Sequence, residues 1–115
     1  MNRFKSLIAL VMPLITAYAA ATEVGDVSIV SLDVNRSLQQ VFVLTSSTHK
    51  PQMDCHKDIW WHFTFSIKTE ADKAVFSTLL AAQSAGKKVF ISGKSDCQPD
   101  GYNRVEELLH VTIKN

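Results

Sequence analysis

The spacing of apolar residues changes from a strand period to a helical period at Thr69, and this change limits the folds that the sequence can adopt. Residues 58–68, which precede it, alternate in polarity. One face carries Trp61, Phe63, Phe65 and Ile67, and the other carries Trp60, His62, Thr64 and Ser66. A period of two with one apolar face predicts a half-buried strand over Asp58–Lys68.

After Thr69 the apolar residues recur every three or four positions, which predicts an amphipathic helix over Glu70–Ala85. Thr69, with an acidic residue three positions later, matches a variant of the capping box, and Gly86 is the expected C-terminal cap. The apolar stripe of the helix consists of Val75, Phe76, Leu79 and Leu80. We expect Phe76 and Leu79 to fill the space between the strands.

Four other segments have the composition of strands. They are Gly25–Val34, Gln40–Thr45, Lys88–Ser92 and Val105–Ile113. In the last of these, Leu109, Val111 and Ile113 are expected to face inward, with His110 and Thr112 outward. The order β-β-β-α-β-β is that of an OB-fold, a small five-stranded barrel that binds oligosaccharides or oligonucleotides, although other five-stranded α+β folds share it. We therefore expect one mainly β domain over residues 22–115.

The N-terminal segment predicts where the protein resides. A short apolar run follows two cations, Arg3 and Lys5, and ends in small residues with A-x-A spacing. This order predicts a secretory signal peptide over residues 1–21, cleaved after Ala21 or, as second choice, after Ala19. A membrane anchor is disfavoured because the run is too short to cross roughly 30 Å of hydrocarbon. We expect an exported protein, periplasmic or secreted, whose mature chain has no membrane span.

The charge of the chain argues against nucleic acid as a partner. Cleavage would remove two of the twelve Lys and Arg residues and none of the eleven Asp and Glu residues, which takes the formal net charge from +1 to −1. Nucleic-acid-binding domains instead carry clustered Lys and Arg.

Cys55 and Cys97 are the only two cysteines, and an exported chain meets an oxidising compartment. They predict one disulfide, worth on the order of 4 kcal/mol of stabilisation in the chain-entropy description. The alternative is a metal site that uses Met53, Cys55 and His56. It is disfavoured because Cys and His alone lack zinc-ligand spacing and because oxidation consumes the thiolate. We expect no metal and no cofactor.

No residue pattern predicts catalysis. The four histidines, His49, His56, His62 and His110, have no i, i+4 pairing, and no serine lies in a G-x-S-x-G context. Glu106 and Glu107 would point to opposite faces of a strand, so they cannot act as a carboxylate pair. The sequence therefore favours a non-enzymatic protein.

Trp60 and His62 are the best candidates for ligand contact. On the polar face of a strand, an exposed indole beside a polar ring suits the stacking of a sugar. The alternative is that Trp60 packs under the helix or under the Cys55 loop and that His62 is an ordinary surface residue. Tyr102, in the loop over Gly93–Asn103, is a further candidate.

The helix and its flanks, Thr69–Val89, followed by Gly93-Lys-Ser-Asp-Cys97, resemble a segment of small secreted bacterial proteins similar to the binding subunit of subtilase cytotoxin. The resemblance extends over about half of the mature chain. It implies an OB-fold and, as in the toxin, a ring of five subunits that binds surface glycans. The sequence thus predicts a secreted binding module, and the resemblance implies a glycan-binding homo-pentamer. The alternative is a monomeric periplasmic or secreted OB-fold protein with a structural or inhibitory role towards a protein partner.

Overall fold

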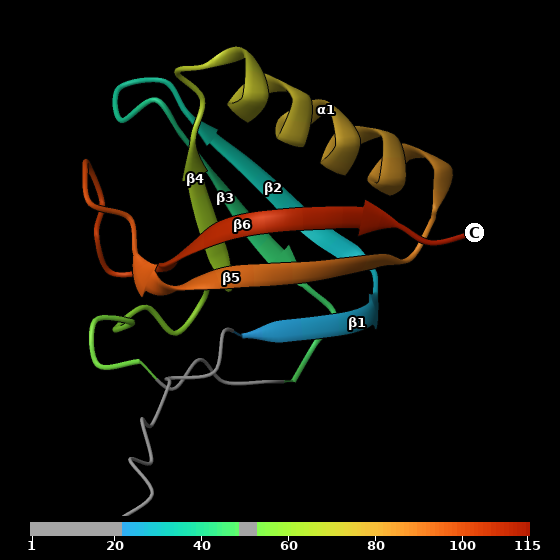
Figure 1. Ribbon diagram of the computed structural model, residues 1–115, viewed down its shortest axis with the longest axis horizontal. Coiled ribbons are helices and arrows are strands. Elements are labelled where there is room, and N and C mark those ends of the chain that lie inside the picture. Colours follow the sequence, from blue (N-terminus) through green and yellow to red (C-terminus); the bar gives the residue numbers. More distant parts are fainter. Residues whose placement is uncertain (1–21, 49–52) are drawn as a thin grey trace, which may run out of the picture.

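The computed structural model describes residues 22–48 and 53–115, so the predicted signal peptide and His49 lie outside the described residues. The described chain forms one six-stranded sheet and one helix (Figure 1). In chain order the elements are β1 (Glu23–Val27), β2 (Ile29–Asn35), β3 (Gln40–Thr45), β4 (Phe63–Ser66), α1 (Glu70–Ala85), β5 (Val89–Cys97) and β6 (Glu106–Ile113).

The strands follow the order β1-β5-β6-β4-β3-β2 across the sheet. Neighbouring strands are antiparallel except β4 and β6, which are parallel. A parallel pair needs a long crossover connection, and α1 with β5 provides it. The predicted small, mainly β domain with one helix is confirmed. The predicted five-stranded barrel is wrong in its strand number and is not closed, because the sheet has six strands and is open, with β1 and β2 at its edges.

The sixth strand arises because the predicted strand over Gly25–Val34 is interrupted at Ser28. The Ser28 amide donates a hydrogen bond to the Ser46 hydroxyl oxygen, at 2.9 Å, instead of to a neighbouring strand. Asp26, just before the break, has a φ of 52°. The two halves pair with different strands, β1 with β5 and β2 with β3.

The predicted strand over Asp58–Lys68 is much shorter than expected, since only β4 is extended. Phe63 and Phe65 of the predicted apolar face are buried as expected, but Thr64, expected on the polar face, is also fully buried. The Thr64 hydroxyl donates to the Val41 carbonyl at 2.9 Å, so a polar residue is accommodated inside. Both faces of β4 are therefore covered.

The helix prediction is confirmed in its bounds and in both caps. Thr69 Oγ1 accepts from the Asp72 amide at 3.1 Å, and Asp72 Oδ2 accepts from the Thr69 amide at 3.0 Å, which completes the capping box. Gly86 ends the helix with a φ of 64°. The helix packs against β2 and β6, with Leu79 fully buried and Phe76 half-buried against the core.

The last two strands differ from prediction in length and phase. β5 continues past the expected end at Ser92 as far as Cys97. Leu109, expected inside, has 55% of its surface exposed, while Leu108 is buried. A register shift between Ser92 and Gly93 changes which side of β6 faces the core. Beyond the shift, Val111 and Ile113 pack against the core, and His110 and Thr112 are exposed, as predicted.

The core lies between the sheet and α1. Its buried members are Val24, Val27, Ile29, Val41, Val43, Phe63, Phe65, Leu79, Ala82, Val89, Ile91 and Leu108. Within the described residues, no helix is long and apolar enough to cross a membrane.

Candidate ligand-binding surface

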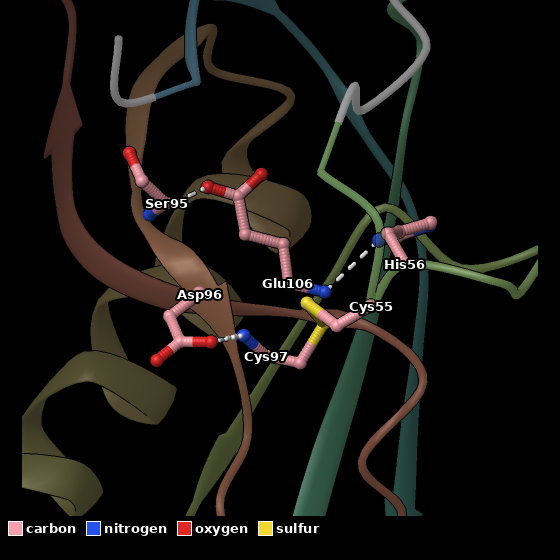
Figure 2. The surroundings of a disulfide bond; sticks show 6 residues. All are labelled: Cys55, His56, Ser95, Asp96, Cys97 and Glu106. Atoms are coloured by element: carbon pink, nitrogen blue, oxygen red, sulfur yellow. Dashed lines mark hydrogen bonds between the residues drawn. A yellow bond between two sulfur atoms is a disulfide. The ribbon is translucent and has the colours of Figure 1, made fainter. Parts of the chain in front are cut away.

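Two segments meet at one end of the sheet and carry the three predicted ligand-contacting residues, Trp60, His62 and Tyr102. They are residues 53–62, before β4, and residues 98–105, between β5 and β6; Figure 1 shows them at the same end of the molecule. The predicted disulfide is confirmed: Cys55 is bonded to Cys97, with a Cα–Cα distance of 6.0 Å (Figure 2). It fixes the start of one segment to the start of the other.

Hydrogen bonds continue this alignment beyond the disulfide. The amides of Lys57 and Asp58 donate to the Arg104 carbonyl at 3.0 and 3.1 Å. The Glu106 amide donates to Nδ1 of His56 at 3.0 Å (Figure 2). Burial lowers the pKa of His56, although Asp58 opposes the shift, and the ring must be unprotonated at Nδ1 to accept this bond. The two segments therefore hold each other in one arrangement.

Asp58 lies at the centre of the surface. Its Oδ1 accepts from the amides of Trp60 and Trp61 at 2.7 and 2.8 Å, which forms an Asx turn, and its Oδ2 accepts from the Tyr102 hydroxyl at 2.8 Å. Burial disfavours the charge of Asp58, but these three donors outweigh it and lower its pKa. The hydrogen bond to Asp58 raises the pKa of Tyr102, because the Tyr102 hydroxyl donates to a carboxylate. One ionised side chain thus orders three aromatic residues.

The aromatic rings form a continuous series, which we call the aromatic cluster: Trp60, Trp61, Phe42 and Tyr102. The ring centroids are 6.5 Å apart for Trp60 and Trp61, 5.8 Å for Trp61 and Phe42, and 5.7 Å for Phe42 and Tyr102. These are the separations at which aromatic pairs attract. Phe42 is buried in β3, Trp61 and Tyr102 are half-buried, and Trp60 is 62% exposed. The cluster therefore runs from the core to the surface.

Gln40, the first residue of β3, fixes the Tyr102 loop from inside the protein. Its Oε1 accepts from the Tyr102 amide at 2.8 Å, and its Nε2 donates to the Tyr102 carbonyl at 3.1 Å and to the Thr64 hydroxyl at 3.2 Å. Gly101 has a φ of 66°, and a Cβ there would overlap Gln40 Oε1. The close approach of the loop to Gln40 thus requires glycine.

His62 does not lie beside Trp60 on a strand face, which corrects the predicted pairing. Its Nδ1 accepts from the Thr45 amide at 3.2 Å and lies 2.8 Å from the Thr45 hydroxyl oxygen, and its own amide donates to the Val43 carbonyl. These bonds turn the ring towards β3. The structure therefore brings Trp60 together with Tyr102 through Asp58, and it places His62 in a supporting position against Thr45.

The alternative metal site is not formed. Both sulfur atoms are bonded to each other, and the described residues contain no group of three or more His, Cys, Asp and Glu side chains that could hold a metal ion. His56, one of its three proposed ligands, instead accepts from the backbone of β6.

Sequence reasoning missed Phe42, Gln40, Asp58 and Gly101 as parts of this surface. Two of them left a signal. A glutamine at the start of an otherwise apolar strand indicates a buried amide with fixed partners. An aspartate two and three residues before a Trp-Trp pair fits an Asx turn as well as a strand. Phe42 and Gly101 acquire their roles only through contacts distant in the sequence.

No family model matches this chain, and comparisons with curated proteins and with solved structures also produced no match.

Proposed function

We propose that this protein is an exported, non-catalytic binding module and that its aromatic cluster binds a glycan. The observation that carries the proposal is Trp60: its indole is 62% exposed, its ring centroid lies 6.5 Å from that of Trp61, and its backbone amide is held by Asp58. A fixed aromatic ring can stack on the apolar face of a sugar without a large loss of side-chain freedom.

Polar groups for sugar hydroxyls lie along the same two segments. Lys57, Asn103 and Arg104 are exposed there, and Tyr102 is half-buried. An aromatic surface bordered by a few hydrogen-bonding side chains is the usual composition of a small-ligand site. The disulfide supports the proposal of export, since such bonds persist in oxidising compartments.

The fold part of the proposal is an OB-fold variant in which the first strand is divided at Ser28. Three features support it: β1 and β2 are consecutive yet occupy the two edges of the sheet, β4 and β6 pair in parallel, and α1 lies between β4 and β5 in the chain. The predicted resemblance to the binding subunit of subtilase cytotoxin extends the proposal to a ring of five subunits.

Tryptophan fluorescence tests glycan binding when the oxidised mature protein is titrated with neutral and with sialylated oligosaccharides. Trp60→Ala should abolish binding and leave the thermal melt nearly unchanged, because the indole is mostly exposed. Leu109→Ala, at an exposed leucine on β6, is the matched control and should bind like the parent. A stable Trp60→Ala protein with parental affinity would exclude Trp60 from the site, and a parent that binds no glycan would overturn the proposal.

The second candidate function is that of a monomeric, exported protein with a structural or inhibitory role towards a protein partner. It is favoured by Ile59, which is fully exposed beside Trp60, since protein interfaces are commonly centred on rigid apolar anchors. Light scattering after size exclusion separates the two candidates in part. A species of five times the monomer mass favours the ring, and a monomer that binds no glycan favours the protein partner.

A further inference from the structure

The turn that joins β2 to β3 begins with the sequence Asn35-Arg36-Ser37. Asparagine followed two positions later by serine or threonine, with any residue but proline between them, is the acceptor pattern for N-linked glycosylation of exported proteins. Asn35 is the only asparagine of the chain that has this pattern. Asn103 provides an internal comparison, because arginine also follows it but valine takes the place of the serine.

The structure exposes this acceptor segment. Asn35 is the last residue of β2, and β2 is an edge strand, so no described strand covers its outer side. Arg36 and Ser37 are exposed and Asn35 is half-buried. Figure 1 shows the turn projecting beyond the sheet. An enzyme can therefore reach the three residues together, and a bulky group attached there displaces no part of the core.

The side chain of Asn35 is held in a way that leaves its nitrogen available. Oδ1 accepts from the Leu38 amide at 2.9 Å, which orients the side-chain amide across the turn. None of the hydrogen bonds found among the described residues uses Nδ2, the atom to which a sugar would be attached. A hydrogen bond from the Gln39 amide to the Arg36 carbonyl, at 3.3 Å, closes the turn itself. The acceptor segment therefore has one defined conformation.

Asp33 extends the acceptor segment on its N-terminal side. Because side chains alternate along a strand, Asp33 and Asn35 lie on the same face of β2. Asp33 is exposed, and the ion pairs found within the described residues do not involve it. Its carboxylate is thus available to a cationic group of an enzyme. Acceptor sites in exported bacterial proteins commonly carry an acidic residue at this position.

We propose that Asn35 is a site of N-linked glycosylation in the exported protein. The sugar donor is an oligosaccharide attached through a diphosphate to a lipid carrier, and the catalyst is an oligosaccharyltransferase of the exporting cell. Nδ2 of Asn35 forms a bond to the anomeric carbon of the first sugar and loses one proton. The bond from that carbon to the diphosphate oxygen breaks, and its electron pair leaves with the diphosphate. The Ser37 hydroxyl is the group by which the transferase recognises the segment.

This inference rests on the proposed export and not on the proposed binding of glycans by the aromatic cluster. The glycan here is attached covalently, on a turn between β2 and β3, whereas the cluster would bind free glycans through Trp60. The mass of the purified protein shows whether the signal peptide has been removed. Failure of export, failure of glycan binding and failure of glycosylation can therefore be distinguished.

The test is mass spectrometry of the full chain, expressed with its signal peptide in a bacterial host that has an oligosaccharyltransferase. The same cells produce a reference exported protein that is known to be glycosylated at an Asp-x-Asn-x-Ser segment. We expect a species heavier than the mature chain by the mass of one glycan. Fragmentation of the glycopeptide should place the glycan on Asn35. The peptide that contains Asn103 should be unmodified, although Asn103 is exposed.

Two substitutions of Ser37 provide a matched pair. Ser37→Ala should abolish the modification, and Ser37→Thr should preserve it, because serine and threonine both satisfy the acceptor pattern. Since Ser37 is exposed, both variants should melt at the temperature of the unglycosylated parent. Asn35→Gln should also abolish the modification, because it moves the side-chain amide away from the position that the transferase recognises.

An unmodified parent, in cells that glycosylate the reference protein, would overturn the proposal. A glycan that persists in Ser37→Ala would do the same, since the serine would then have no part in recognition. A glycan that maps to Ser37 itself, or to Asn103 with Asn35 unmodified, would assign the modification to another residue and would also overturn it.

Discussion

Gln40 and Tyr102 lie 62 residues apart in the sequence and are joined by two hydrogen bonds, from the Tyr102 amide to Gln40 Oε1 and from Gln40 Nε2 to the Tyr102 carbonyl. The side-chain amide of Gln40 thus pairs with the backbone of Tyr102 much as a neighbouring strand would. Because Gln40 is buried, water cannot take the place of either partner if one of these hydrogen bonds is lost. The position of Tyr102 in the aromatic cluster depends on this pair.

Gln40→Leu should destabilise the protein by about 2–3 kcal/mol, because it leaves the buried groups around Tyr102 without partners. Chemical denaturation measures the change. Gln83→Ala is the control, since Gln83 is exposed on α1 and makes only a 3.5 Å contact with the Val30 carbonyl, and it should be nearly neutral. Equal stability of Gln40→Leu and the parent would contradict a structural role for the pair.

Gly101→Ala should destabilise the protein more than Gly86→Ala does. Both glycines have left-handed φ values, 66° and 64°, so both substitutions carry a similar backbone cost of about 1 kcal/mol. Only at Gly101 would the added Cβ overlap Gln40, whereas at Gly86 it would meet nothing within 4 Å. The difference between the two unfolding free energies therefore isolates the overlap, and a difference of zero would show that the loop can move away from Gln40.

Replacing the disulfide should cost about 2–5 kcal/mol of stability. The double variant Cys55→Ser, Cys97→Ser removes it without leaving an unpaired thiol. Mass spectrometry of the oxidised parent should show the loss of two hydrogens, and denaturation of both proteins gives the cost. Two alkylatable thiols in the parent purified from an oxidising compartment would contradict the bond.

Leu79→Ala should destabilise the protein by about 2–5 kcal/mol, since Leu79 is fully buried between α1 and the sheet. Ser84→Ala, on the exposed side of the same helix, should be nearly neutral. Urea denaturation ranks the two. The reverse ranking would mean that α1 presents another face to the core.

Stability should fall in two stages as the pH is lowered. Burial lowers the pKa of His56 in the folded protein from 6.5. Below that pH the unfolded state therefore binds more protons than the folded state, and the first loss of stability begins there. Burial would raise the pKa values of Asp58 and Asp72, but hydrogen bonds outweigh it and lower both from 3.8. The contribution of these carboxylates to stability is therefore present above that pH and is lost below it. Denaturation over a pH series follows both stages.

Two variants assign these stages. His56→Leu should remove the upper stage, because no ring remains to be protonated. Asp58→Asn should reduce the lower stage without abolishing it, because Asp72 still titrates there. An unchanged pH profile in both variants would contradict the assignment.

The helix could be predicted because its determinants are local. The capping box at Thr69, the glycine at the other end and the apolar spacing between them all lie within eighteen consecutive residues. The strand over Asp58–Lys68 could not, because Asp58 can either continue a strand or cap the amides of Trp60 and Trp61, and the sequence pattern fits both.

The placement of Leu109 and His62 depended on contacts distant in the sequence. Leu109 is exposed because of a register shift opposite Ser92 and Gly93, which alternation along β6 alone does not reveal. His62 is turned to Thr45 by bonds that span 17 positions. The sequence predicted part of the candidate surface, Trp60 and Tyr102, because aromatic residues in polar surroundings near a cysteine can be recognised in a sequence. The hydrogen bonds that join both residues to Asp58 cannot.

The pairing of β1 with β5 has a consequence for the order in which the protein folds. β1 is the first described strand, and its partner begins at Val89, after more than half of the chain. β2, which follows β1 directly, can pair with β3 as soon as a short turn has formed. A chain that becomes available from its N-terminus during synthesis would thus assemble the β2–β3 hairpin early and hold β1 unpaired until the C-terminal third emerged. Such dominance of distant contacts predicts slow folding and a late, vulnerable interval in which one strand edge is available to other chains.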